Sequence, residues 1–277
     1  MPTPDHLKAL AECYAPIFAH KVDEEWIAAD QLAPIDFAGG LSDVARNLPA
    51  FFRLSRKKKA TISNPKVYFS VVETGTHTSL IYAVYHIFDW WKRDNPTNLY
   101  DLIRDRLDEH AHDMEGALLV IRKRPENLLD GIITVSHRDF YLYSEPRRPI
   151  DKKTTEDVNG EQTLHIVKFR KEDIDGNVWI DHNTYRPKLF IQAKGHGMRG
   201  DHSGWGGGNY GEYYKEATVM KDPGALNSDN NNPVRIYQLE DIFKPDGLWE
   251  HRYRLGTFRQ GANGRSQRPK PRWRNSY

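Results

Sequence analysis

Apolar and polar residues alternate along several segments of the chain, and this period of two is typical of half-buried β-strands. The clearest segments are residues 67–73 and 78–88, with residues 74–77 as the turn between them. The same pattern, or a short apolar run, predicts strands at residues 17–20, 116–121, 131–136, 141–144, 163–169, 188–193 and 234–239. Apolar residues at helical spacing predict short helices at residues 6–15, 41–52 and 98–107.

Many short strands, frequent turns and few helices indicate a mainly β protein and not an alternating βαβ sheet. We expect an antiparallel, jelly-roll-like β-sandwich with a few short peripheral helices, formed by residues 1–256 as a single domain. Residues 197–211 contain seven glycines and predict a long flexible loop within this domain. Residues 257–277 are predicted to be a basic, disordered tail.

Composition limits where the protein acts. The 277 residues have a net charge of +2 and one cysteine, which excludes an intrachain disulfide and fits a reducing compartment. Cys13 lies in the apolar pattern of the first helix, and we expect it to be a small core residue. No apolar stretch approaches the ~20 residues that span a bilayer, and the N-terminus lacks the form of a signal peptide. These features predict a cytoplasmic protein without a transmembrane segment.

The segment from Asp108 to Val120 is the strongest candidate for chemistry. If it is a strand, Asp113 and Glu115 point to one face, and a bend at Ala111 would let His110 join them. Two carboxylates on one face repel each other unless a cation or a proton compensates. Carboxylates with an imidazole suit Mg²⁺, Mn²⁺ or Ca²⁺, or Zn²⁺ in a four-ligand geometry. The alternative is a solvated charged turn before a core strand.

Two families resemble this chain at a few motifs. Residues 109–115 resemble the Gly-His-Arg-His-Asp-Trp-Glu heptapeptide of necrosis-inducing, NPP1-type proteins and the Gly-x-x-Gly-Asp-Trp-Glu segment of Vps62-like proteins (vacuolar protein sorting-associated 62). Residues 82–89 are similar to the segment that precedes the heptapeptide, and residues 14–25 and 188–196 are similar to Vps62-like segments. The resemblance implies a jelly-roll-like sandwich with a divalent metal ion held by Asp89, His110, Asp113 and Glu115.

The chain departs from both patterns in ways that bear on function. Met114 replaces the aromatic residue of the motif and Glu109 replaces its glycine, and we expect neither the disulfide nor the secretion signal of the necrosis-inducing proteins here. A role as a toxin acting on plant membranes therefore does not transfer directly.

Two functions follow from these expectations. One is a metal-dependent hydrolase acting on an ester, phosphoester or glycan, with His196 and His137 as candidate proton-transfer residues because each ends a predicted strand. The alternative is a non-catalytic module whose cation binds a small molecule, a glycan or a lipid headgroup, which the resemblance favours. Nucleic acid is a further partner only through the basic residues of the tail, Arg259 to Arg274.

Overall fold

The structure is a computed structural model, and it describes twelve parts of the chain. These are residues 3–22, 27–35, 62, 64–89, 110–123, 128–136, 139–144, 175–181, 184, 186–200, 211–216 and 233–251. The predicted helices at 41–52 and 98–107, the predicted strand at 163–169, residues 201–210 of the glycine-rich segment and the predicted tail at 257–277 lie outside the described residues.

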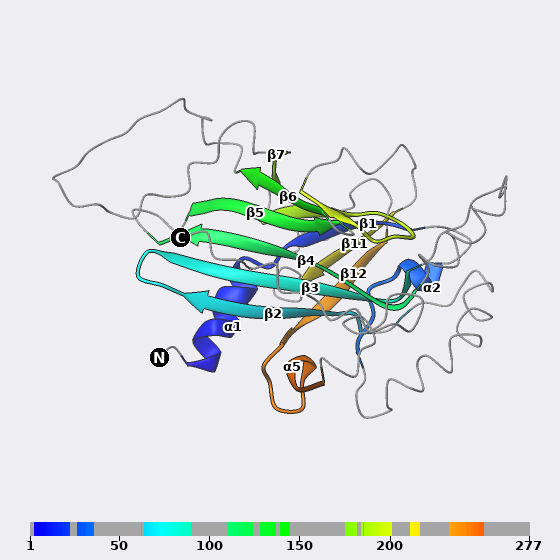
Figure 1. Cartoon of the computed structure of the whole chain (residues 1–277), viewed down its shortest axis with the longest axis horizontal. Coiled ribbons are helices and arrows are strands. Elements are labelled where there is room, and N and C mark those ends of the chain that lie inside the picture. Colours follow the sequence, from blue (N-terminus) through cyan, green and yellow to red (C-terminus); the bar gives the residue numbers. More distant parts are fainter. Residues whose placement is uncertain are drawn as a thin grey trace.

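The described residues form one twelve-stranded sheet (Figure 1). Its strands are β1 (Ile17–Lys21), β2 (Lys66–Glu73), β3 (His77–Asp89), β4 (His110–Arg122), β5 (Leu128–Ser136), β6 (Asp139–Ser144), β7 (Gly176–Asn177), β8 (Trp179–Ile180), β9 (Pro187–Ile191), β10 (Met198–Arg199), β11 (Gly211–Glu216) and β12 (Val234–Asp241). Their order is β10-β9-β1-β11-β12-β2-β3-β4-β5-β6-β7, with β8 paired to β9.

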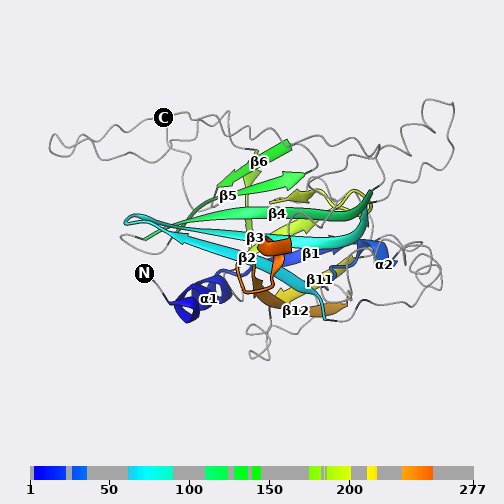
Figure 2. The ribbon, with the colours of Figure 1, turned by 60° about the horizontal axis from the view of Figure 1, so that its bottom comes forward.

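This sheet nearly closes into a barrel. Strand β12 joins its two parts, because residues 234–237 pair with β11 and residues 238–241 pair with β2. The segment β7–β8 joins the far ends, since β7 pairs with β6 and β8 pairs with β9. Gly200, just after β10, lies so close to the Tyr143 ring of β6 that a Cβ atom there would be 2.6 Å from its carbons. Figure 2 shows β2 to β6 in their sequence order, with helix α1 (Pro4–Cys13) beside β2.

The expectation of a mainly β protein with few helices is confirmed, but the expected two-layer sandwich is not. The strands from β2 to β6 are antiparallel, as predicted. Strand β1 pairs in parallel with β9, and β12 pairs in parallel with both β11 and β2. Local alternation predicts strands but not their partners, so these parallel pairs and the closure of the sheet were not foreseen.

The barrel interior is filled mainly by apolar and tyrosine side chains. Their alternation along β3 and β4 is the one expected from the sequence, since Leu80, Tyr82, Leu119 and Ile121 are buried. The hydroxyl of buried Tyr82 has a backbone partner, because it donates to the carbonyl of Ala11 at 2.8 Å. Paired in this way, Tyr82 fills the core without leaving its hydroxyl unsatisfied.

In the described part of the chain, three short helices accompany the sheet: α1, α2 (Ile27–Asp30) and α5 (Leu248–His251). Thr3 caps α1, because its hydroxyl oxygen accepts a hydrogen bond from the backbone N–H of His6. The prediction that Cys13 is a core residue is wrong. Ala11 is the buried residue of α1, and Cys13, two positions on and therefore about 200° around the helix, is exposed. No helix among the described residues is long and apolar enough to cross a membrane.

Candidate metal centre

The pairing of β3 with β4 places His86 beside Asp113. The two residues are direct partners in the antiparallel register, and Val84 pairs with Glu115 two positions along. Direct partners point to the same face of a sheet, and here that face is the barrel interior, where His86 is 0% and Asp113 is 7% exposed. Asp113 and Glu115 therefore share one buried face, as the sequence predicted.

A tight turn after β9 brings His196 to the same point. Within it, the backbone N–H of Gln192 donates to the carbonyl of Gly197 at 3.1 Å, and His196 has a positive φ of 49°. A Cβ atom on Gly197 would lie 2.1 Å from the hydroxyl oxygen of Ser136 in β5, so any other residue here would require Ser136 to move. The turn thus lies directly against β5 and holds the His196 imidazole inside the barrel, where it is fully buried.

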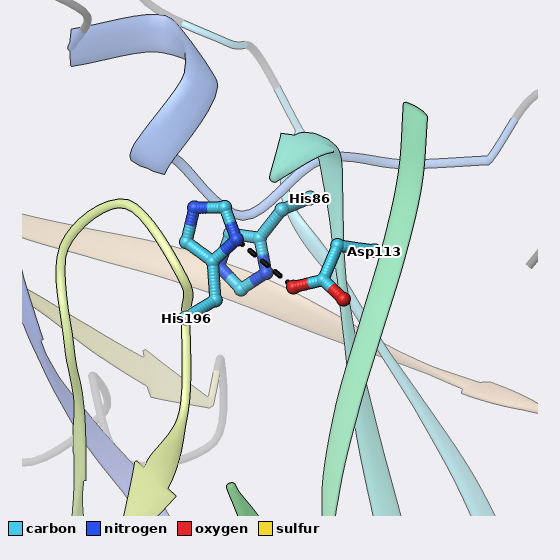
Figure 3. Close-up of side chains that lie close together, drawn as sticks. All are labelled: His86, Asp113 and His196. Atoms are coloured by element: carbon cyan, nitrogen blue, oxygen red, sulfur yellow. Dashed lines mark hydrogen bonds and ion pairs between the residues drawn. The ribbon is translucent and has the colours of Figure 1, made fainter. Parts of the chain in front are cut away.

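The His196 ring lies between two carboxylates. Its Nδ1 is 3.0 Å from Oδ2 of Asp113, and its Nε2 is 3.1 Å from Oδ1 of Asp30 at the end of α2 (Figure 3 shows the Asp113 bond). The backbone N–H of Lys194 also donates to Asp30, at 2.8 Å. Burial lowers the pKa of His196, but the hydrogen bonds and charges of Asp113 and Asp30 outweigh it and raise this pKa to about 10. Without a metal ion, His196 is therefore a buried imidazolium.

Two further histidines complete the cluster. The His86 ring stacks on His196, with centroids 3.8 Å apart and planes within 5°. On its other side, Nε2 of His86 lies 2.8 Å from Nε2 of His20 in β1. Burial and the charge of His196 lower the pKa of His20 to about 4 and hold the pKa of His86 well below its usual value. Both rings are neutral at pH 7, beside one charged ring.

His86, Asp113 and His196 form a group that could hold a metal ion. One potential ligand atom from each lies within 4.8 Å of the others, and all three residues are buried. The site lies at the end of the barrel next to α2, where β3 ends and β4 begins (Figure 1). The side chain of His196 is 0% exposed and that of Asp113 is 10% exposed.

The predicted site residues fall into three groups. Asp113 and His196 come together, and Glu115 lies on the same buried face. Asp89 and His110 are direct backbone partners at the ends of β3 and β4, but their side chains lie outside the described part of the structure. His137 also lies outside the described residues. Strand β4 runs unbroken from His110 to Arg122, so the backbone does not make the expected bend at Ala111.

Sequence reasoning missed three residues of the cluster: His20, Asp30 and His86. A signal existed for His86, because it continues the phase of the buried residues Leu80, Tyr82 and Val84 along β3. A histidine in phase with a buried apolar face must find a polar partner there. No comparable pattern marks Asp30, the last residue of the short helix α2, or His20, the residue before the end of the short strand β1.

Comparisons with known proteins give little beyond this geometry. No protein-family model matches the sequence, and no curated protein matches it significantly. One similar solved structure is the Necrosis and Ethylene inducing Protein 2 from the causal agent of cocoa's Witches Broom disease, at 14% identity over 74% of this chain and 70% of that chain, with a TM-score of 0.36. Another is NLPPya in complex with mannosamine, at 13% identity over 74% and 71% of the two chains, with a TM-score of 0.32.

The non-toxic HaNLP3 protein matches more weakly, at 17% identity over 52% of this chain and 58% of that chain, with a TM-score of 0.27. The neighbours include necrosis-inducing proteins, one of the two families that the sequence resembles, whereas none of the comparisons supports the Vps62-like resemblance. At TM-scores below 0.5, these likenesses assign neither the fold nor a function to the chain.

Proposed function

We propose that this protein binds a divalent cation through His86, Asp113 and His196. One observation carries the proposal: two imidazoles and a carboxylate from β3, β4 and the turn after β9 converge inside the barrel, with ligand atoms within 4.8 Å. Buried ionisable groups need compensation, and a cation here would replace the proton that His196 shares with Asp113. Glu115, on the same face, is a further candidate ligand. The assignment of Asp89 and His110 as ligands stays a prediction from the sequence.

The ligand set bears on which cation binds. Imidazole nitrogens suit Zn²⁺ and carboxylates suit Mn²⁺, whereas Mg²⁺ and Ca²⁺ prefer sites built from oxygen atoms alone. With two imidazoles and one carboxylate, we propose Zn²⁺, or Mn²⁺ as the alternative, ahead of Mg²⁺ and Ca²⁺. Three protein ligands also leave at least one coordination position for water or an external ligand.

The use of the cation that we favour is ligand binding without bond cleavage. If His196 is a ligand through Nδ1 while its Nε2 contacts Asp30, neither nitrogen is left to move a proton. This proposal therefore gives His196 the role of ligand in place of the proton carrier predicted from the sequence. The cation would bind hydroxyl or phosphate oxygens of a glycan or lipid headgroup.

Hydrolysis is the second candidate, and Glu115 is the reason. Its carboxylate lies on the same inner face as Asp113 and is buried. A carboxylate so placed could accept a proton from a cation-bound water, as metal-assisted hydrolysis requires.

The test begins with metal content. Untagged protein is analysed by elemental mass spectrometry as purified and after separate dialysis against Zn²⁺, Mn²⁺, Mg²⁺ and Ca²⁺. We expect about one equivalent of Zn²⁺ or Mn²⁺ in the wild type and none in Asp113→Asn. Asp130→Asn is the matched control, because Asp130 also pairs with a histidine, at 3.2 Å, and this histidine, His77, begins β3, whereas His86 lies near the end of β3. Equal metal content in wild type and Asp113→Asn would refute the site.

The two uses of the cation are then separated with the metal-loaded protein. Turnover of nitrophenyl esters or phosphoesters that disappears in Glu115→Gln would establish hydrolysis. Metal-dependent retention on glycan or lipid arrays without turnover would establish binding.

A further inference from the structure

A chain of hydrogen bonds runs from the backbone of β1 to the candidate metal centre. Nδ1 of His20 lies 2.7 Å from the carbonyl oxygen of Lys21, and Nε2 of His20 lies 2.8 Å from Nε2 of His86. His20 and His86 are both fully buried. We call this chain the Lys21–His20–His86 relay.

The donor and acceptor properties of the three groups determine where the proton of each hydrogen bond lies. A carbonyl oxygen can only accept, so the Lys21 contact requires a proton on Nδ1 of His20. One proton must lie between the two Nε2 atoms, because two N–H groups cannot face each other at this distance. If His20 held it, the ring would be charged, buried, and 5.9 Å from the His196 ring. A neutral His20 instead accepts, and the proton lies on Nε2 of His86.

This assignment leaves Nδ1 of His86 as an unprotonated nitrogen. It is buried and has no hydrogen-bond partner among the described residues. Because His86 and Asp113 are direct cross-strand partners, the same ring that is held by His20 lies beside the carboxylate of Asp113 (Figure 3). A buried acceptor without a donor is the atom that a cation would use.

We infer that His20 is a positioning residue of the metal centre: it accepts the Nε2 proton of His86 and so presents the unprotonated Nδ1 of His86 to the cation. The inference rests on the proposed function. Asp30 has the matching role for His196, because it contacts Nε2 of that ring and leaves Nδ1 toward Asp113. Ligating histidines commonly have such a partner on the other nitrogen, which fixes the tautomer and the orientation of the ring.

The first measurement needs no metal. Two-bond ¹H–¹⁵N correlation spectra of the metal-free protein at pH 7 distinguish protonated from unprotonated ring nitrogens. We expect the proton of His86 on Nε2 and that of His20 on Nδ1, each ring being neutral. A His86 proton on Nδ1 would overturn the inference, because a protonated nitrogen has no lone pair with which to bind a cation.

The second measurement uses variants. His20→Leu removes the acceptor, and we expect Zn²⁺ affinity to fall about 10- to 100-fold, as for other outer partners of metal ligands. His20→Gln carries an amide oxygen at similar reach, and we expect it to recover most of this loss. His77→Gln, which alters an imidazole bonded to Asp130, is the control and should leave the affinity unchanged.

The outcomes are distinguishable. A purely structural role for His20 would lower thermal stability in both variants without separating Leu from Gln in metal affinity, and this result overturns the inference. If His20→Leu does not fold, the comparison of His20→Gln with wild type and the wild-type spectra still decide the point. A wild type that binds no cation, with the His86 proton on Nε2, would refute the proposed function while the proton assignment stands.

Discussion

Replacing His196 by alanine should strongly destabilise the metal-free protein. The imidazolium of His196 lies between Asp30 and Asp113, with both bonds near 3 Å, and its side chain is fully buried. His196→Ala leaves the two carboxylates facing each other inside the barrel without the positive charge between them. Removing one member of a buried ion pair is costly because the remaining charge stays desolvated.

Two independent estimates give the size of the effect. Breaking a buried ion pair costs about 3–5 kcal/mol in proteins. A pKa of His196 raised from 6.5 to about 10 corresponds to about 5 kcal/mol of folding free energy. For a chain of this size, 1 kcal/mol shifts the melting temperature by about 2–4 °C, so we expect a fall of roughly 6–20 °C.

The assay is urea unfolding of wild type and His196→Ala in the presence of a chelator. The pH dependence provides a second check. Because the folded pKa of His196 is raised, its contribution is fully present below pH 6.5 and is lost as the pH rises toward 10. Wild type should therefore lose stability between pH 7 and pH 10, and the part of this loss due to His196 should be missing in His196→Ala.

Two control variants sharpen the test. His77→Ala removes a histidine from a partly exposed pair with Asp130, and about 0–1 kcal/mol should be lost. Adding Asp30→Asn to His196→Ala removes one of the two facing charges and should recover part of the lost stability. A loss below 1 kcal/mol in His196→Ala, with no recovery in the double variant, would refute the buried-charge reasoning.

Three further predictions concern the same end of the barrel. Burial lowers the pKa of His20 to about 4 and lowers that of His86, so the two histidines contribute to folding stability above pH 6.5 and this contribution is lost toward pH 4. Urea unfolding of the metal-free protein at pH 7, 5.5 and 4.5 should show that the free energy of unfolding falls with pH, and that it falls less in His20→Gln. Gly197→Ala should lower stability by about 1–3 kcal/mol and weaken Zn²⁺ binding, because its Cβ would lie 2.1 Å from the Ser136 hydroxyl. Calorimetry should show that adding Ser136→Gly recovers part of the lost stability. No change in the single variant would contradict the packing argument. Zn²⁺ at a hundred times its dissociation constant should stabilise wild type by about 2.7 kcal/mol, reversibly on chelation, and an unchanged melting temperature would count against the site.

Local patterns in the sequence determined several elements of this protein. The period of two predicted β2 to β6 and placed Asp113 and Glu115 on one face of β4, which the structure confirms for both buried side chains. Helical spacing ended by Pro16 predicted α1 to within two residues at each end. These predictions succeeded because periodicity depends only on which neighbouring residues share a face.

Strand β11 shows where local pattern fails. Its residues, Gly211–Glu216, are all buried, including Glu212, Lys215 and Glu216, so no alternation marks it in the sequence. Its charges are compensated by distant residues: Glu212, for example, accepts hydrogen bonds from Arg235 at 2.7 and 3.0 Å. Such a strand is stable only when its partners are already in place, because buried charges need their counterparts.

The candidate metal centre was decided in the same way by tertiary structure. Strand pairing brought His86 beside Asp113, and barrel closure brought in His20, Asp30 and His196, each of which is far from Asp113 along the chain. Asp113 could be identified from sequence because other ionisable residues lie next to it in the chain, whereas the residues that it contacts in the structure come from other segments. Local pattern determines which face a side chain occupies, and only long-range pairing determines what it meets there.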